Sequence, residues 1–282
     1  MKLGYCLWGM PKVALEESLP KLAAIGYQGV ELTVLPGWSA PLEELTPQRR
    51  KEIRKMLEDN NLALTAVAGH LDILHGDAEV IARNMQRLRE SIDLAAELDA
   101  GRGPAIMVSL VGGRPEDWEA ERYKLAERVR ELGEYAGTRG AIYATEMHTG
   151  TAMDVPEKVL WVLKQAGEMP SLRMNFDQSH TETMGIPIEV AAPMVAPYTV
   201  HTHVKDQRGL WPNHEFLTPG EGPCDYVKYL REMHKAGYKH FINIEVSVMR
   251  QRKPDYEPFV HAAFAYRVLD YAFQASGAPW EK

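Results

Sequence analysis

Four ionisable side chains in the C-terminal half of the chain each fall at or near the end of a short apolar run. They are Glu146, Asp177, His203 and Glu245. A carboxylate in such a run is costly to bury unless it is paired or hydrogen-bonded, and one divalent cation would satisfy several of these groups at once. Three carboxylates and one imidazole form an oxygen-rich site, which favours Mn²⁺, Mg²⁺ or Co²⁺ over the thiol-rich sites of structural zinc.

The segments around these residues alternate β-rich runs with longer runs of helical periodicity, a pattern typical of parallel βα units. We expect strands over residues 3–6, 29–33, 63–68, 105–109, 142–147, 173–177, 199–204 and 241–246. We expect helices over residues 13–25, 48–60, 78–98, 115–138, 156–167, 187–195, 225–236 and 258–274. Eight such units predict an α/β protein with a (β/α)8 TIM barrel, in a single domain over residues 1–282. A doubly wound open sheet is the alternative, but no GxGxxG motif follows the first predicted strand.

The barrel would bring the four side chains together, because the C-terminal ends of its strands converge on the active site. A simpler reading exists for each residue alone. A single Glu at a strand end is more often a salt-bridge partner at the barrel rim, and a single His is more often a hydrogen-bonded core residue. Such structural roles would have to explain all four residues, each at the same end of a neighbouring strand. A single metal site explains them together, so the pattern favours a metal site.

Composition excludes several classes of protein. The chain has 282 residues, 45% of them hydrophobic, and a formal net charge of −7, which argues against nucleic-acid binding. The N-terminal residues lack the apolar stretch of a secretion signal, and no apolar run reaches the length needed to span a bilayer. Two cysteines, Cys6 and Cys224, are too few for a disulfide framework. We therefore expect a cytoplasmic protein without membrane or nucleic-acid partners.

Several short motifs resemble those of one known family. The segments are Gly26-Tyr27-Gln28-Gly29-Val30-Glu31-Leu32, Glu146-Met147-His148, Asp177-Gln178-Ser179-His180, His201-Thr202-His203-Val204-Lys205-Asp206, Pro219-Gly220-Glu221-Gly222 and Ile244-Glu245-Val246. In this order, over nearly the whole chain, they resemble the xylose isomerase-like TIM barrels, the sugar phosphate isomerase/epimerase family. That group includes sugar isomerases and epimerases, inosose dehydratase-like enzymes and endonuclease IV-like nucleases.

The resemblance implies roles for individual residues. Glu146, Asp177, His203 and Glu245 match the ligands of a single divalent metal ion, with Mn²⁺ preferred and Mg²⁺, Co²⁺ or Zn²⁺ as alternatives. His180 matches a residue that contacts substrate beside the metal.

Further residues are expected around the substrate. Glu31 and His70 match positions that face the pocket, either touching substrate or ordering the strand ends. His148 lies two residues after Glu146 and is expected to point the same way, as a substrate contact or as a hydrogen-bond partner of a ligand. Lys205 and Asp206 are expected to pair at the start of the following loop.

The chain also departs from the nucleases of this group. They need further histidines for three zinc ions, but the fourth predicted strand ends without one, and the loop after the seventh offers only Asn213-His214-Glu215. Nuclease activity is therefore not expected. We expect His214 either to contact substrate or to be an exposed loop residue.

Aromatic and basic residues complete the expected pocket. Aromatic faces suit the apolar C–H surfaces of sugars, although aromatic residues are also ordinary packing residues. The candidates for the pocket walls are Trp8, Met10, Trp38, Trp211 and Phe216. The loop over residues 209–222 is long enough to act as a lid. Arg250, Arg252 and Lys253 could bind a phosphate or form a charged surface loop, and we favour an unphosphorylated substrate.

The implied activity is that of a metal-dependent sugar isomerase or epimerase. Glu146 and Glu245 would remove and return protons next to the carbonyl of a ketose or related keto-sugar. The same site could serve a lyase or dehydratase acting on a keto-inositol or 3-keto-glycoside, or a non-catalytic sugar-binding barrel. The resemblance also makes a homo-oligomer plausible. The ligand residues alone do not distinguish these outcomes.

Overall fold

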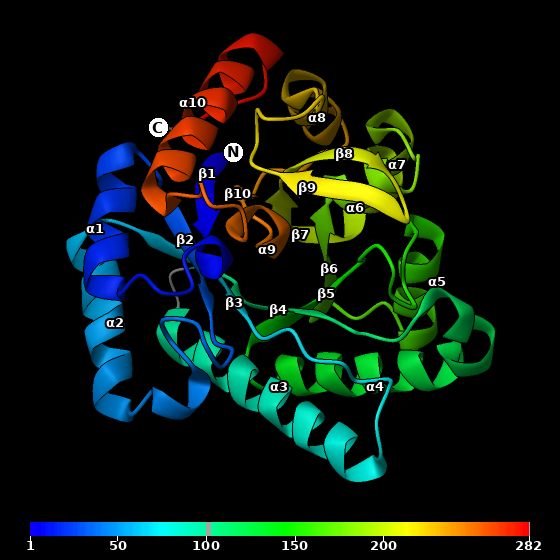
Figure 1. Cartoon of the computed structure of the whole chain (residues 1–282). Coiled ribbons are helices and arrows are strands. Elements are labelled where there is room, and N and C mark those ends of the chain that lie inside the picture. The colour runs from blue at the N-terminus through cyan, green and yellow to red at the C-terminus, as the bar shows by residue number, and fades with distance from the viewer. Residues whose placement is uncertain (100–102, 282) are drawn as a thin grey trace.

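The parallel strands of the protein close into a barrel. The computed structural model describes residues 1–99 and 103–281. Its barrel strands are β1 (Lys2–Cys6), β2 (Gly29–Thr33), β3 (Ala63–Ala68), β4 (Ala105–Leu110), β5 (Ala141–Glu146), β6 (Leu172–Asp177), β7 (Thr199–Val204) and β10 (Phe241–Ile244). Hydrogen-bonded neighbours follow the order β1-β10-β7-β6-β5-β4-β3-β2, and β2 pairs with β1 to complete the ring (Figure 1). The predicted (β/α)8 barrel is confirmed.

Helices connect the strands and surround the barrel (Figure 1). They are α1 (Leu15–Ile25), α2 (Pro47–Asp59), α3 (Ala78–Asp99), α4 (Trp118–Thr138), α5 (Pro156–Ala166), α6 (Gln178–Thr183), α7 (Ile188–Val195), α8 (Tyr226–Lys235), α9 (Val248–Gln251) and α10 (Pro258–Ser276). Short 3-10 turns cover Leu7–Gly9, Leu42–Glu44, Pro115–Asp117 and Ala196–Tyr198. None of the described helices is both long and apolar enough to cross a membrane.

Local chemistry explains where several helices begin and end. The Thr46 side chain accepts a hydrogen bond from the Arg49 backbone N–H at the start of α2, and Pro47 fills the first helical position. Gly26 and Gly167 end α1 and α5 with φ angles of 118° and 103°, a left-handed conformation that favours glycine. The two glycine caps are followed by short connections, from α1 to β2 and from α5 to β6.

The segment after β7 differs from the predicted loop. It contains an antiparallel hairpin of β8 (Asp206–Leu210) and β9 (Asn213–Leu217), in which Asp206 pairs with Leu217. Gly209 and Pro212 are turn-forming residues, so the sequence pattern predicted a loop where the two short strands form. The short helices α6 and α9 were also not predicted, because neither is long enough to show a period.

The core has two parts. The large apolar core includes the buried residues of the helices that pack against the barrel. A second, small cluster consists of Ala66, Ile106, Val108 and Ala144 from β3, β4 and β5. Ala144 lies two residues before Glu146 and therefore faces the same side of β5. Apolar side chains thus lie below the polar residues at the strand ends.

The Asp206 carboxylate anchors the chain that follows the hairpin. It is fully buried and accepts hydrogen bonds from the backbone N–H groups of Gly220, Gly222 and Cys224 at 3.0, 3.0 and 3.1 Å. The Gln207 N–H donates to it as well, at 3.0 Å. One side chain therefore fixes the path of residues 218–224 between the hairpin and α8.

Replacing Asp206 by Ala should lower the free energy of unfolding by about 4 kcal/mol or more, because four backbone N–H groups would lose a charged acceptor at roughly 1–3 kcal/mol each. Urea denaturation measures the change. Asp225→Ala is the matched control. Asp225 is exposed and accepts from the Lys228 N–H as the cap of α8, so its loss should cost about 1 kcal/mol. Equal losses in the two variants would contradict the anchoring role of Asp206.

Candidate active site

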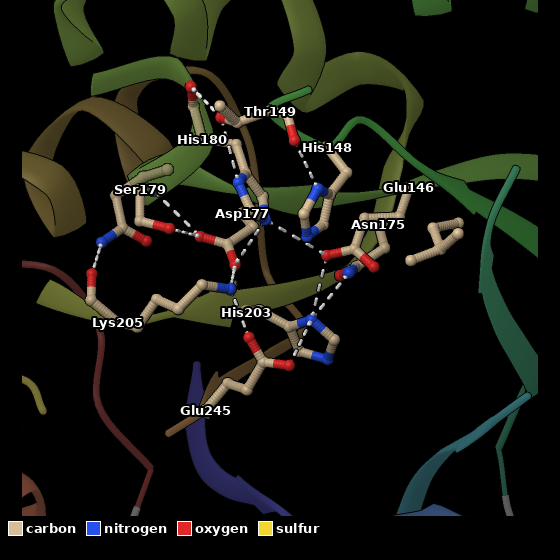
Figure 2. A network of polar contacts seen from close by, with 12 residues as sticks. Glu146, His148, Thr149, Asn175, Asp177, Ser179, His180, His203, Lys205 and Glu245 are labelled. Carbon is tan, nitrogen blue, oxygen red and sulfur yellow. Dashed lines mark hydrogen bonds and ion pairs between the residues drawn. The ribbon is translucent and has the colours of Figure 1, made fainter. Parts of the chain in front are cut away.

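The four predicted ligand residues converge at the C-terminal end of the barrel. Glu146 and Asp177 end β5 and β6, His203 lies near the end of β7, and Glu245 directly follows β10 (Figure 2). All four are buried. His203 Nδ1 is 3.3 Å from Glu146 Oε1 and 4.0 Å from Glu245 Oε1. Candidate ligand atoms of Asp177, His203 and Glu245 lie within 4.8 Å of one another, an arrangement that could hold a metal ion.

Lys205 contributes a positive charge that sequence reasoning did not assign to the site. Its ammonium group donates to Asp177 Oδ2 and Glu245 Oε2 (Figure 2). Burial alone would lower the pKa of Lys205, but the two carboxylates raise it well above its ordinary value. The expected pairing of Lys205 with Asp206 is wrong, since Asp206 bonds to backbone N–H groups instead.

The short helix α6 carries His180 against the carboxylates. Asp177 caps this helix, because its Oδ1 accepts from the backbone N–H of Ser179 at 2.9 Å and from its hydroxyl at 2.7 Å. His180 Nε2 lies 3.6 Å from Asp177 Oδ2 and 4.0 Å from Glu146 Oε1. Nε2 is buried without a hydrogen-bond partner among the described residues. Burial lowers the pKa of this imidazole well below its ordinary value. The other ring nitrogen, Nδ1, is 3.2 Å from the Thr149 hydroxyl, so it is the Nε2 side of the ring that faces the cluster without a partner.

A second wall comes from the N-terminal half of the barrel. His70 Nδ1 accepts the Leu110 N–H at 3.1 Å and lies 3.6 Å from Glu146 Oε2. The Trp8 and His70 rings pack edge to face with their centroids 5.4 Å apart, and the Trp38 ring stacks on Trp8 with a centroid distance of 4.3 Å. His70 therefore lies beside Glu146, and Trp8 packs against the far side of this contact through the His70 ring.

The hairpin closes the opposite side. His148 lies against His180, with ring centroids 3.9 Å apart, and its Nδ1 donates to the Thr149 carbonyl at 2.8 Å. The centroid of the Phe216 ring on β9 lies 5.1 Å from that of His180 and 4.7 Å from that of His214. Burial lowers the pKa of both His148 and His214. These residues form a continuous aromatic and imidazole surface above the carboxylates.

The tip of the hairpin rests on the loops of neighbouring strands. The Trp211 N–H donates to the Thr183 carbonyl at 2.9 Å. A Cβ atom added to Gly150 would lie 2.7 Å from the Trp211 ring, so the ring packs directly on this glycine. The ring remains 43% exposed, at the rim rather than in the interior.

Glu31 occupies a deeper position than expected. It is fully buried, and its Oε2 lies 2.7 Å from His203 Nε2 and 3.2 Å from His201 Nε2. The Cys6 thiol donates to its Oε1 at 2.6 Å. Burial alone would raise the pKa of the Glu31 carboxyl, but the charge and hydrogen bond of His203, with His201 and Cys6, lower it to about 2. His203 lies between Glu31 and Glu146, a position that suits the expected alternative in which Glu31 orders the strand ends.

Other predicted pocket residues also lie elsewhere. Met10 is fully buried in the apolar core. Arg250 is buried in ion pairs with Glu221 and Asp255, at 2.8 and 2.9 Å, so its guanidinium does not form a phosphate site. Lys253 pairs with Glu215 at 2.8 Å and ties the segment after α9 to the hairpin. These contacts hold the rim of the barrel together.

Asn175 is a site residue that sequence reasoning missed. Its Nδ2 lies 3.0 Å from His203 Nδ1, and its Oδ1 lies 3.0 Å from His201 Nδ1. Asn175 is two residues before Asp177, and His201 is two residues before His203. Because side chains two apart in a strand face the same side, this spacing was the signal that could have identified both residues.

The donor set fits a divalent cation. Glu146, Asp177 and Glu245 supply carboxylate oxygens around one imidazole, and the unpartnered His180 nitrogen faces two of them. Burial raises the pKa of the Asp177 carboxyl, which shows the cost of placing this charge in the interior. The pKa of Glu146 is nevertheless lowered, because the attraction of His203, His70 and Lys205 outweighs its burial. Carboxylates thus outnumber the cationic side chains that stabilise them.

Comparisons with known proteins agree with this architecture. The "Xylose isomerase-like TIM barrel" family matches residues 19–261. The rhizopine catabolism protein MocC of Rhizobium meliloti is 26% identical over 93% of this chain and 83% of its own length. Fructoselysine 3-epimerase of Shigella flexneri is 22% identical over 90% of this chain and 93% of its own length. The solved structure of the IolI protein with a zinc atom superposes with a TM-score of 0.78 at 15% identity, covering 98% of each chain.

Replacing Lys205 by Met should destabilise the metal-free protein by about 3–5 kcal/mol, because it leaves two buried carboxylates without their partner. Lys228→Met is the matched control. The pair between Lys228 and Glu189 is about half exposed, so its loss should cost at most about 1 kcal/mol. Denaturation of chelator-treated protein measures both values. A Lys205 variant as stable as the control would contradict this account of the cluster.

Proposed function

Because the chain belongs to the xylose isomerase-like TIM barrel family, we propose that it is a divalent-metal-dependent epimerase or isomerase of a ketose or related keto-sugar. The observation that carries the proposal is a pair of overlapping clusters that share Asp177. Ligand atoms of Asp177, His203 and Glu245 lie within 4.8 Å of one another, and so do those of Glu146, Asp177 and His180. The name of the fructoselysine 3-epimerase relative supports this class of reaction.

These four residues would hold the cation, with Mn²⁺ as the preferred ion. The zinc atom in the IolI structure supports a metal in this fold. When bound, the ion polarises a substrate carbonyl and acidifies the adjacent C–H group. Lys205 would then share Asp177 and Glu245 with the ion and reduce the excess negative charge around it.

The chain's own carboxylates would move the protons. Glu146 ends β5 and Glu245 directly follows β10, and β6 and β7 lie between these two strands. Carboxylates on two sides of a bound sugar can remove a proton from one face and return one to the other, which inverts the carbon next to the carbonyl. Transfer by one carboxylate between neighbouring carbons would instead give isomerisation.

Imidazole and aromatic groups would bind the remainder of the substrate. His180, His148 and His70 surround the carboxylates, and their nitrogens suit sugar hydroxyl groups. Trp8 and Phe216 provide apolar faces for the C–H surfaces of the ring or chain. The site residues are buried, so substrate entry would require the β8–β9 hairpin to move away from His180.

Hydrogen exchange with solvent tests the proposal. Metal-free and Mn²⁺-loaded protein would be incubated in D₂O with a panel of a ketohexose, fructoselysine, a keto-inositol and a 3-keto-glucoside, then treated with a chelator and analysed by NMR and mass spectrometry. We expect metal-dependent loss of a C–H signal next to the carbonyl, with an epimer or isomer as the product. Loss of water or of an aglycone would indicate a lyase instead. Binding without exchange for every substrate would indicate a sugar-binding barrel.

Glu146→Gln and Glu245→Gln should each reduce turnover by about 10²–10⁴-fold, the usual contribution of a general acid or base. Steady-state kinetics and deuterium incorporation measure the loss. Glu189→Gln serves as the control, because Glu189 is on the surface in an ion pair with Lys228 and should leave both rates unchanged. Full activity in both site variants would contradict the proposed proton transfer.

Removal of the metal should abolish turnover while leaving the fold intact. Lys205 and His203 still pair with the carboxylates in the metal-free protein, so circular dichroism should be unchanged. Adding back Mn²⁺ should restore activity. Unchanged turnover in protein shown by elemental analysis to contain no metal would contradict metal dependence.

A further inference from the structure

We propose that Glu31 is a positioning residue that holds the His203 imidazole with its Nδ1 atom turned to the metal ligands. This inference rests on the proposed metal site. It assigns Glu31 neither to the substrate nor to the cation. The contacts of the two imidazole nitrogens of His203 carry the argument.

His203 meets a different environment at each ring nitrogen. Nε2 lies 2.7 Å from Glu31 Oε2, whereas Nδ1 faces Glu146 at 3.3 Å and Glu245 at 4.0 Å. An ionised carboxylate can only accept hydrogen bonds, so Nε2 must carry a hydrogen to bond with Glu31. In a neutral imidazole, Nδ1 then keeps the free lone pair. In the metal-free protein Nδ1 can itself donate to Glu146 Oε1. It would offer its lone pair to a cation held by the same carboxylates, while the hydrogen on Nε2 stays bonded to Glu31.

Asn175 is consistent with the same tautomer. Its amide Nδ2 is 3.0 Å from His203 Nδ1 and can donate only to an unprotonated nitrogen. The amide oxygen is engaged by His201 Nδ1 at 3.0 Å. Glu31 thus requires a hydrogen on Nε2, and the Asn175 amide can donate to Nδ1 whenever Nδ1 carries none.

The backbone places Glu31 for this contact. The pairing of β2 with β3 shifts register between Val30 and Glu31, an irregularity that can redirect a side chain. Strands β1 and β10 lie between β2 and β7 in the barrel, so Glu31 reaches across the interior to His203. A side chain that only filled the core would not need a carboxylate at this depth.

Two other roles for Glu31 fit the contacts less well. Substrate contact is disfavoured, because Glu31 is fully buried and both of its oxygens have partners. A second cation between Cys6, Glu31 and His203 is sterically conceivable, since their ligand atoms lie within 4.8 Å of one another. However, direct hydrogen bonds of 2.6 and 2.7 Å already join Glu31 to Cys6 and His203. The count of bound ions tests this alternative.

A carboxylate that bonds to a metal-bound histidine affects the affinity of the site for the metal. Metal-bound histidines usually donate their second N–H to a carboxylate or carbonyl, and removal of that partner weakens metal binding by about 10–100-fold. Glu31→Gln keeps the size of the side chain but removes its charge, and it offers His203 Nε2 an amide in place of a carboxylate. The amide can either accept from His203 Nε2 or donate to it, so it no longer fixes the hydrogen on that nitrogen as a carboxylate does.

The experiment measures Mn²⁺ affinity directly. Metal-free wild type, Glu31→Gln and Thr33→Val would be titrated with Mn²⁺ in competition with a fluorescent chelator. We expect one ion per chain and a dissociation constant about 10–100-fold higher in Glu31→Gln than in the wild type. Thr33 is the matched control, because it is buried on the same strand and its hydroxyl has no hydrogen-bond partner among the described residues. Its affinity should equal that of the wild type.

The results of the Mn²⁺ titration distinguish a failure of the Glu31 positioning role from a failure of the proposed function. A wild type that binds no Mn²⁺ would overturn the proposed function, and the inference with it. A wild type that binds Mn²⁺ and a folded Glu31→Gln variant that binds it equally well would overturn the inference alone. Two ions per wild-type chain would favour the second cation site.

A second measurement uses the wild-type protein and does not depend on the folding of the variant. Nitrogen-15 NMR of the histidine side chains, with the diamagnetic ions Mg²⁺ or Zn²⁺ bound, reports which ring nitrogen of His203 carries hydrogen. We expect the hydrogen on Nε2, with a shift of the Nδ1 signal on metal binding. Hydrogen on Nδ1 would overturn the positioning role of Glu31.

Discussion

Negative charge buried at one end of the barrel is the constraint on which the site depends. Glu146, Asp177 and Glu245 enter a region from which solvent is largely excluded, and each carboxylate must find a positive or hydrogen-bonding partner there. Lys205 and His203 supply this compensation in part. The remaining excess of carboxylates is what makes the cluster suitable for a divalent cation.

The barrel strands and the loops that follow them place these carboxylates and their partners. Adjacent strands deliver the ligand residues to one point, and a capped turn of helix places His180 against them. The Asp206 carboxylate fixes the chain beyond the hairpin, while Phe216 covers the imidazoles. The barrel strands therefore hold the charged groups, and the hairpin, which adds two strands outside the barrel, packs against His180 beside them.

Sequence patterns predicted the barrel and the four converging residues because both depend on local signals: alternation of strands with helices, and ionisable residues at strand ends. The position of Glu31 could not be predicted in the same way. Its contact with His203 crosses the barrel and depends on a register shift between β2 and β3, which no local pattern reports. Lys205 was misassigned for a similar reason, since the choice between Asp206 and the ligand carboxylates is made by tertiary packing. The hairpin was missed because its turn residues look like those of a loop.

The most direct measurement of the central claim is anomalous X-ray diffraction from crystals grown with Mn²⁺, recorded on both sides of the manganese absorption edge. The account predicts one strong anomalous peak per chain, within bonding distance of Glu146, Asp177, His203 and Glu245. A peak at another place in the protein, or no peak when Mn²⁺ is in excess, would contradict it.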